Sequence, residues 1–346
     1  MNLKILSVLV LLTTMTATAK TTLQTFSSEA FQTSKLQQVT AGPVVRLSPA
    51  QKTGTLESAE IAVPAFDTLI LSWNAKAPVG TQVRLEARVF TAGHWSRYYT
   101  LGIWSEDEKV RQSVNGQKDS DGRVLTDTLK LTSQGTKYQY RVTFQSSKAG
   151  ASPELRNISV MTSSASKPGA YTPNKTVWGK VLDVPLRSQM IYPDGGEAWC
   201  SPTSTSMVMK YYGIDLSVPE AAQKTYDPAY DGTGNWVFNT ALAGSHGLNA
   251  YVTRLEHLGE AEQWISKNVP VIISMGWKKG ELPGAPLPQS SGHLMVIVGF
   301  DKNGNVVMND PAGKDDTQVR RTYNRAILEK LWLEHSGGTA YIIQKP

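Results

Sequence analysis

A short segment without hydrophobic periodicity divides this chain into two parts that differ in pattern. Residues 163–176 are mostly small, polar or proline, a composition typical of a linker. Before this segment apolar and polar residues alternate as in strands, and after it helix-like and strand-like runs are mixed. The 346 residues suffice for two ordinary domains. We therefore predict one domain at residues 20–162 and a second at residues 177–346.

The first domain is predicted to be an antiparallel β-sandwich of jelly-roll-like type. Apolar residues occupy every second position of 83–89 and of 138–144, and polar residues lie between them. Strands with one apolar and one polar face are typical of sandwiches. The aromatic stretch 94–104 leaves two alternatives open: a face that stacks on sugar rings, or, more commonly, part of the core.

The first nineteen residues are typical of a secretory signal peptide. Lys4 supplies the positive start, an apolar run follows at Ile5–Leu12, and small residues precede a cleavage site near Ala19. No stretch reaches the roughly 18 unbroken apolar residues that a membrane helix needs. We expect the mature protein to be secreted or held in the cell envelope, without a transmembrane segment.

Composition excludes few partners but disfavours nucleic acid. The formal charge of +6 becomes 34 − 29 = +5 once residues 1–19, which contain Lys4 and no acid, are removed. This excess favours an anionic cell surface, yet the cations are scattered rather than clustered. The chain also lacks a phosphate loop, a serine elbow and a zinc-binding histidine pair. We predict no nucleic-acid partner, and the sequence identifies no cofactor-binding or metal-ligating residues, which leaves a bound structural metal ion open.

The second domain is predicted to be α+β, because its helical patterns come first and most of its strands later. Ser217 and Glu220 form a capping box that opens one helix. The other predicted helices are at 235–245, 261–267 and 327–334, and the predicted strands at 249–253, 269–275, 294–300, 306–309 and 341–344.

Cys200, the only cysteine of the chain, is placed where a helix should begin. Ser201 is predicted to cap this helix and Pro202 to lie in its first turn. The dipole and the unpaired N–H groups of a helix N-terminus favour the thiolate, which is the nucleophilic form of cysteine. The alternative is that Cys200 is a small buried hydrophobe. An unpaired thiol in an exported protein favours a working role.

His293 and Asp310 are the residues that could activate this thiol. His293 opens an apolar strand, and Asp310 follows the next strand after a turn at residues 301–305. If the two strands form a hairpin, both side chains lie at the same end of the sheet. A carboxylate bonded to one imidazole nitrogen then leaves the other nitrogen for the thiol. Taken alone, His293 could equally be a core histidine and Asp310 a turn residue.

Gln189 is the candidate oxyanion donor. It follows a short extended entry at Val184–Leu186, and a side-chain amide beside a nucleophile stabilises the negative charge that develops during acyl transfer. This role requires the loop at Tyr192–Ala198 to fold back toward Cys200. A surface glutamine is the alternative.

Together these residues resemble the papain-like (clan CA) cysteine peptidases, and most of all the branch with the double-glycine leader peptidases of bacteriocin exporters. The resemblance covers about Leu182 to Gln344. It implies a papain-like fold, with Cys200 as nucleophile, His293 as base, Asp310 as orienting residue and Gln189 as oxyanion donor. The motifs that carry it are Val184-Pro185-Leu186-x-x-Gln189, Trp199-Cys200-Ser201-Pro202-Thr203, Gly292-His293-Leu294-Met295-Val296-Ile297-Val298-Gly299 and Asn309-Asp310-Pro311.

The chain departs from that family in two places. Ser201 stands where relatives usually have glycine, and three additional residues, 194–196, lengthen the interval between Gln189 and Cys200. We expect an exported cysteine peptidase that hydrolyses a peptide or isopeptide bond in a peptide or protein substrate, with the sandwich domain on a cell-wall polymer or glycan. Two alternatives stay open: acyl transfer to an amine by the same residues, and an inert binding protein of the cell envelope.

Overall fold

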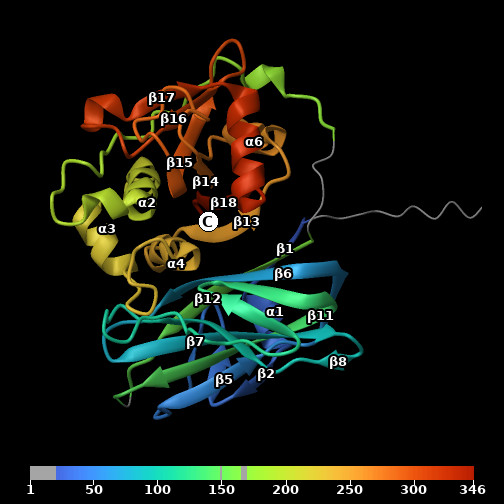
Figure 1. Ribbon diagram of the computed structural model, residues 1–346. Coiled ribbons are helices and arrows are strands. Elements are labelled where there is room, and N and C mark those ends of the chain that lie inside the picture. Colours follow the sequence, from blue (N-terminus) through green and yellow to red (C-terminus); the bar gives the residue numbers. More distant parts are fainter. Residues whose placement is uncertain (1–20, 149, 165–169) are drawn as a thin grey trace, which may run out of the picture.

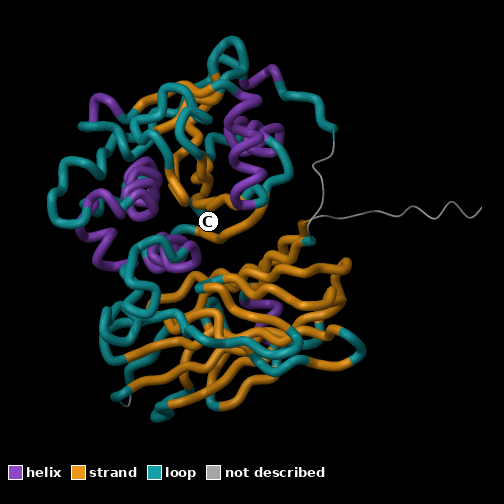
Figure 2. Tube along the Cα trace, in the orientation of Figure 1, coloured by secondary structure: helices purple, strands orange, loops and turns teal. Residues whose placement is uncertain are grey.

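The computed structural model describes residues 21–148, 150–164 and 170–346. The predicted signal peptide and the centre of the predicted linker lie outside these residues. A β-rich domain occupies the lower half of Figure 1 and a mixed α+β domain the upper half. Figure 2 shows strands throughout the lower domain, and helices around a smaller sheet in the upper one. The predicted α+β class is confirmed.

All strand pairs of the β-rich domain are antiparallel, and its sheet runs in the order β2-β5-β11-β6-β12-β4-β3. The long strand β11 (Thr128–Ser146) also pairs with β7 and β10, so it joins the parts of the domain. The remaining elements are β1 (Thr21–Phe26), α1 (Ser28–Gln32), β2 (Lys35–Gln37), β3 (Val39–Ala41), β4 (Val45–Leu47), β5 (Thr53–Glu57), β6 (Ile61–Lys76), β7 (Thr81–Thr91), β8 (His94–Trp95), β9 (Tyr99–Trp104), β10 (Gly122–Leu125) and β12 (Glu154–Ser163).

The aromatic stretch of this domain packs mainly in the core. Tyr99 and Trp104 of β9 are buried. Trp95 and Tyr98 are half-buried, and the Arg88 guanidinium lies over both rings, 4.8 and 5.1 Å from their centroids. Arginine therefore covers the aromatic rings that remain partly accessible on this face.

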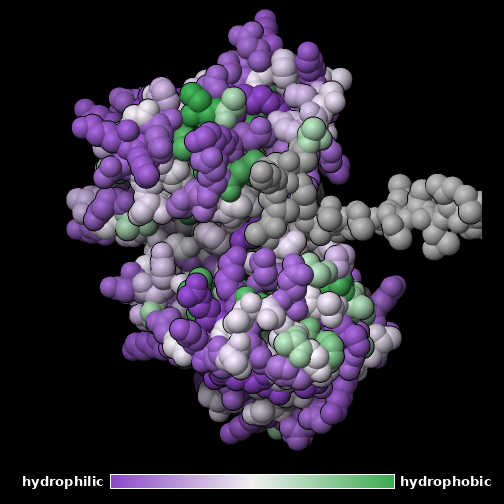
Figure 3. Space-filling model, turned by 45° about the vertical axis from the view of Figure 1, so that its right-hand side comes forward, coloured by the Kyte–Doolittle hydropathy of each residue, from purple (hydrophilic) through white to green (hydrophobic). Residues whose placement is uncertain are grey.

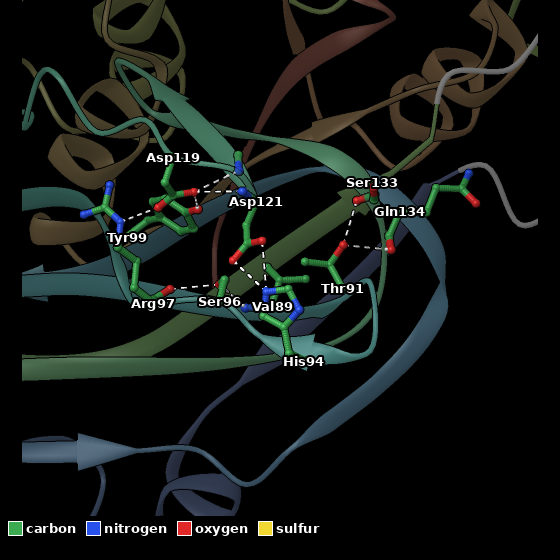
Figure 4. Close-up of polar contacts among 11 residues, drawn as sticks. Val89, Thr91, His94, Ser96, Arg97, Tyr99, Asp119, Asp121, Ser133 and Gln134 are labelled. Atoms are coloured by element: carbon green, nitrogen blue, oxygen red, sulfur yellow. Dashed lines mark hydrogen bonds and ion pairs between the residues drawn. The ribbon is translucent and has the colours of Figure 1, made fainter.

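A polar cluster ties β9 to the loop before β10 (Figure 4). Tyr99 and Arg97 donate to the Asp119 carboxylate, and His94 pairs with Asp121 at 3.0 Å. Burial opposes the ionisation of Asp119, but these hydrogen bonds outweigh it and lower its pKa to about 2. Because the charged groups of this cluster bond to one another, we assign it a structural role.

The α+β domain holds the sheet β13-β18-β14-β15-β16-β17. The capping box at Ser217 is present, and the strand at 306–309 forms with the predicted bounds. The other predicted helices and strands of this domain form with shifted ends, and β17 is an additional strand. Its elements are η1 (Lys175–Val177), η2 (Gly196–Ala198), α2 (Cys200–Tyr211), α3 (Val218–Thr225), α4 (Trp236–Ser245), β13 (Asn249–Arg254), α5 (Leu258–Ser266), β14 (Val271–Trp277), β15 (Ser290–Phe300), β16 (Val306–Asn309), η3 (Asp316–Gln318), β17 (Arg320–Tyr323), α6 (Arg325–Ser336) and β18 (Thr339–Gln344).

Aromatic packing and paired hydrogen bonds join the two domains. Trp73 and Trp104 of the β-rich domain contact Phe238 of α4, with ring centroids 6.1 and 5.7 Å apart. Asn74 donates to the Ala250 carbonyl and accepts from the Ala250 N–H, which extends the pairing across the boundary. Buried apolar contact together with these paired hydrogen bonds favours a fixed arrangement of the two domains over a flexible connection.

Helix termini add electrostatic complementarity to this boundary. Arg111, almost fully buried, donates to the Tyr226 and Gln223 carbonyls at the C-terminus of α3. Asp127 accepts a 2.7 Å hydrogen bond from the Trp236 N–H at the N-terminus of α4. A cation at one helix C-terminus and a carboxyl at another N-terminus both match the helix dipoles. The β-rich domain therefore supplies the end groups for two helices of its neighbour.

Tyr171, just before the α+β domain, packs on that domain. The Tyr171 ring stacks on His257 at 4.0 Å, and its hydroxyl donates to Glu329. Hydrophilic side chains cover most of the face drawn in Figure 3, on both domains. Among the described residues, no helix combines the length and the apolar character needed to cross a membrane.

Candidate active site

Cys200 is the first residue of α2, as the sequence predicts, but the cap of this helix differs from the prediction. Trp199 is the N-cap residue and makes no side-chain capping bond. The Ser201 hydroxyl instead lies 3.0 Å from the Tyr341 hydroxyl, inside the domain. The predicted Ser201 cap is therefore wrong, because a buried tyrosine offers the hydroxyl a partner that local sequence does not reveal.

The predicted hairpin between β15 and β16 forms, with Val296 opposite Asn309. This register brings His293, three residues before Val296, toward Asp310, which directly follows Asn309. The His293 Nε2 atom lies 2.8 Å from Asp310 Oδ1, and both side chains are buried. Because Nε2 faces the carboxylate, Nδ1 is left for the thiol, and His293 and Cys200 share a hydrogen bond.

Asp310 is held by more partners than the sequence suggests. The Tyr323 hydroxyl donates to Oδ2 at 2.7 Å, and the Ala312 N–H donates to Oδ1 at 3.0 Å. Burial opposes ionisation, but His293 and these donors outweigh it and keep the pKa of Asp310 below its usual value. Tyr323 belongs to β17, a strand that the sequence does not predict, because the four residues Arg320–Tyr323 show no alternation of apolar and polar side chains.

The thiol and the imidazole influence each other's pKa in opposite directions. Burial favours the neutral thiol of Cys200, yet the His293 hydrogen bond and charge outweigh it, and the pKa falls. Burial likewise disfavours the imidazolium, but Asp310 and Cys200 raise the pKa of His293 to about 10. The arrangement therefore favours a thiolate–imidazolium pair near neutral pH.

Trp277 covers the histidine from one side. Its ring lies nearly perpendicular to the His293 ring, at 5.6 Å and 79°. The indole N–H donates to the Leu287 carbonyl in the proline-rich loop that precedes β15. An aromatic wall beside a buried ion pair excludes water and so strengthens the electrostatic interaction between the charges.

The loop between Gln189 and Cys200 folds back, despite its additional residues. The two N–H groups of the buried Gln189 amide are directed at the Gly196 and Glu197 carbonyls, 2.8 and 2.9 Å away, while Oε1 has no partner among the described residues. A Cβ atom at Gly196 would lie 2.2 Å from the Gln189 carbonyl oxygen, so this close approach requires glycine. Gln189 thus lies on the loop beside the nucleophile, with its donors engaged.

Cys200 and His293 line a cavity of about 1070 Å³ to which both domains contribute. From the β-rich domain come Leu125, Asp127 and Lys130. The α+β domain contributes the loop at residues 230–234, the start of β15 and the end of α6. Cys200 therefore faces a space that the α+β domain does not enclose alone. The described residues hold no group of three or more His, Cys, Asp or Glu suited to a metal ion.

Two family models match the chain. The Peptidase_C39 like family matches residues 181–340, and the Peptidase C39 N-terminal domain matches residues 14–163. The fold and these matches define a cysteine-type peptidase. Residues 181–340 thus belong to the Peptidase_C39 like family, in agreement with the resemblance of the sequence motifs to cysteine peptidases. No curated protein gives a match.

The solved structures that match parts of this chain have low sequence identity and low TM-scores. A C39-like peptidase from Bacillus anthracis is 17% identical with a TM-score of 0.36, over 48% of this chain and 98% of that one. A double glycine motif protease from an AMS/PCAT transporter, in complex with the leader peptide, is 18% identical with a TM-score of 0.33, over 48% and 94%. TmCBM61 in complex with beta-1,4-galactotriose is 11% identical with a TM-score of 0.22, over 40% and 86%.

Proposed function

We propose that this chain is an exported peptidase that hydrolyses a peptide or isopeptide bond through Cys200, His293 and Asp310. The observation that supports it best is the continuous relay of hydrogen bonds from the thiol through the imidazole to a buried carboxylate. The direction of each pKa shift fits this role: the pKa of the thiol is lowered, that of the imidazole is raised and that of the carboxyl is lowered. The accessible cavity beside the thiol provides room for a substrate.

In the proposed reaction the thiolate of Cys200 attacks the substrate carbonyl carbon. The negative charge moves to the carbonyl oxygen, where the N–H of Cys200 and the amide of Gln189 stabilise it. For this, Gln189 must exchange one of its bonds to the loop carbonyls. The imidazolium of His293 then protonates the leaving amine, and a thioester remains. A water molecule, deprotonated by His293, releases the acid and restores the thiol.

The proposal includes export by the signal peptide and a supporting role for the β-rich domain, with the boundaries 20–162, 163–176 and 177–346. A cell-wall polymer or glycan is its proposed ligand, and Trp95 and Tyr98, which are half-buried and have the Arg88 guanidinium over their rings, are the aromatic side chains proposed to contact it. Co-sedimentation of the Cys200→Ala protein with purified cell walls tests this ligand, with Trp95→Ala as the matched variant. Equal sedimentation of the two proteins would mean that Trp95 does not contribute to cell-wall binding.

Cys200→Ala in the mature protein is the decisive test. We expect loss of at least about a thousandfold in kcat/KM on a library of internally quenched peptides, because the nucleophile is removed. Iodoacetamide should alkylate wild-type Cys200 faster than free cysteine at neutral pH, since the thiolate is favoured. Undiminished turnover by the alanine variant would refute the scheme, and an unreactive thiol with no turnover would favour an inert binding protein.

Product analysis separates hydrolysis from acyl transfer. With an added amine such as glycine amide, a hydrolase yields mainly the free acid, whereas a transferase yields mainly the amide product. Our proposal predicts the acid as the main product.

A further inference from the structure

The cavity beside Cys200 continues to a second pair of charged residues, one from each domain. Arg254 ends β13 of the α+β domain, and Lys130 lies on β11 of the β-rich domain. Both line the same cavity as the nucleophile, and both are half-buried. This end of the cavity therefore exists only because the domains are joined.

These two cations are only weakly compensated. The Arg254 Nη1 group donates to the Ser163 hydroxyl at 2.9 Å, and its Nε is buried without a hydrogen-bond partner among the described residues. The Lys130 ammonium donates to the Thr68 hydroxyl at 2.6 Å. Both polar partners are neutral. Leaving a buried donor unpaired costs free energy, which a bound acceptor would recover.

The pKa shifts of Arg254 and Lys130 also indicate that a bound negative group would be favourable. Burial lowers the pKa of Arg254 and of Lys130, and each feels the attraction of Asp67. The repulsion between the two cations further lowers the pKa of Lys130. One carboxylate thus opposes two nearby positive charges. An additional negative group between them would relieve both the desolvation and the repulsion.

Five carboxyl side chains also line the cavity, and three of them are engaged: Asp127 accepts from the Trp236 N–H, while Asp231 and Glu334 have partners outside the lining; the other two are Glu197 and Glu256. Glu334 pairs with Lys330 at 3.0 Å, and Asp231 accepts from the Tyr226 hydroxyl at 2.6 Å. His335 also lines the cavity, and burial lowers its pKa, so it is mainly neutral at neutral pH. Arg254 and Lys130 therefore provide the positive charge at this end.

The sheet gives the distance between this pair and the catalytic histidine. His293 on β15 is opposite Met275 on β14, β14 pairs with β18, and Thr339 on β18 is opposite Arg254. By this register Arg254 and Thr339 align with Ser274, one residue before Met275, so the backbones of Arg254 and His293 lie near the same edge of the sheet, three strand spacings apart. Three spacings amount to about 14 Å, which an extended peptide covers in about four residues.

We propose that Arg254 and Lys130 form a subsite that binds an acidic side chain, Asp or Glu, about four residues from the scissile bond of the substrate. The inference rests on the proposed function and deepens it by naming a substrate class. Two hydrogen-bond donors on a guanidinium and one ammonium suit a carboxylate. In this arrangement the β-rich domain contributes directly to specificity, through Lys130.

The test uses the mature protein and internally quenched peptides that vary at every position around the cleaved bond. We expect enrichment of Asp and Glu at one position, and a kcat/KM about tenfold higher for a Glu peptide than for the matched Gln peptide. In Arg254→Gln, Lys130→Gln and the double variant, this Glu:Gln ratio should fall toward one. Raising salt should reduce the wild-type ratio, because an ion pair at a half-exposed site is screened.

Lys137→Gln is the matched control. Lys137 lies on the same strand as Lys130 but pairs with Glu60 on the surface, so the ratio should stay at the wild-type value. A thermal unfolding scan shows whether Arg254→Gln folds. If it does not, the Glu:Gln ratio of Lys130→Gln alone tests the subsite.

The outcomes separate this inference from the proposed function. Cleavage without any acidic preference, or a ratio unchanged in the variants, would overturn the subsite and leave the peptidase intact. Failure of the wild type to cut any peptide, together with an unreactive Cys200, would overturn both.

Discussion

Two buried aspartates, one in the candidate active site and one at the domain boundary, have pKa values shifted in opposite directions. Asp310 in the catalytic centre and Asp127 at the boundary are both buried. The pKa of Asp310 is lowered, whereas burial raises the pKa of Asp127 to about 6. Asp310 faces the imidazole of His293, while Asp127 accepts only from a hydroxyl and backbone N–H groups. Burial alone therefore does not decide the ionisation of a carboxyl; a buried cation beside it does.

This difference assigns separate tasks to the two regions. In the candidate active site the imidazole of His293 lies beside Asp310 and lowers the pKa of this carboxyl. The boundary uses a carboxyl that titrates between weakly acidic and neutral pH, and its contacts with α4 hold one wall of the cavity. The β-rich domain is thus a structural part of the active-site cleft as well as a separate folding unit.

Substitutions of Asp310 should give the largest effect among the tests of this comparison between Asp310 and Asp127. Asp310→Ala should lower kcat/KM by about a hundredfold, because His293 loses the acceptor that orients it. Asp310→Asn keeps a hydrogen-bonding side chain without the charge, so it should retain more activity. Its alkaline limb in a pH profile of kcat/KM should move below that of the wild type, since Asp310 helps to raise the pKa of His293 toward 10.

The alkaline limb should move to lower pH because the proposed active form is the thiolate–imidazolium pair. The thiolate–imidazolium pair is lost as pH rises through the pKa of His293, and a lower pKa brings this loss to lower pH. An unchanged alkaline limb in Asp310→Asn would mean that Asp310 does not control the imidazole.

Asp127 gives the next largest effect, on stability rather than on chemistry. In the unfolded chain its carboxyl ionises near pH 4, and in the folded chain near pH 6. Between these values the unfolded state releases a proton that the folded state retains, so the free energy of unfolding falls as pH rises. The difference is worth up to roughly 3 kcal/mol at neutral pH.

Asp127→Asn removes this titration and keeps an acceptor for the Trp236 N–H. Relative to the wild type, its free energy of unfolding in urea should therefore increase from pH 4 to pH 7. Asp119→Asn is a control: the pKa of Asp119 is lowered to about 2, so its titration lies below pH 4 and its difference from the wild type should stay constant from pH 4 to pH 7. Parallel pH curves for Asp127→Asn and the wild type would contradict the assignment.

The smallest effect is expected at Ser201, which stands where relatives usually have glycine. Because its hydroxyl meets Tyr341 and is directed away from the cavity, Ser201→Gly should change kcat/KM by less than about threefold. Loss of the hydrogen bond should lower the free energy of unfolding by about 1 kcal/mol. Tyr341→Phe removes the same bond without changing the helix backbone. A large loss of activity in Ser201→Gly alone would assign Ser201 a role in catalysis.

Much of the catalytic domain was predictable because its signals are local. The capping box at Ser217 and the apolar run of β15 each lie within a few residues, and the hairpin of β15 and β16 follows from a short turn. The family matches agree with the resemblance stated on these motifs. The catalytic roles of Cys200, His293, Asp310 and Gln189 stay predictions until the variants are measured.

Other features could not be read from neighbouring residues. The Tyr323–Asp310 bond depends on β17, whose short sequence has no clear pattern. The N-cap prediction at Ser201 failed because Tyr341, 140 positions away, competes for its hydroxyl. In both cases the partner is distant along the chain and only folding brings it close.

The sequence by itself determined the two-part organisation, the helix that begins at the cysteine and the order of the candidate catalytic residues, since each depends on propensity or spacing over a short range. The tertiary structure alone decided that the β-rich domain lies beside the catalytic cleft, that Asp127 caps a helix of the other domain, and that Lys130 lies with Arg254 in one cavity. The physical reason is that contacts between domains depend on shape and charge complementarity of folded surfaces, and this complementarity exists only once each domain has formed.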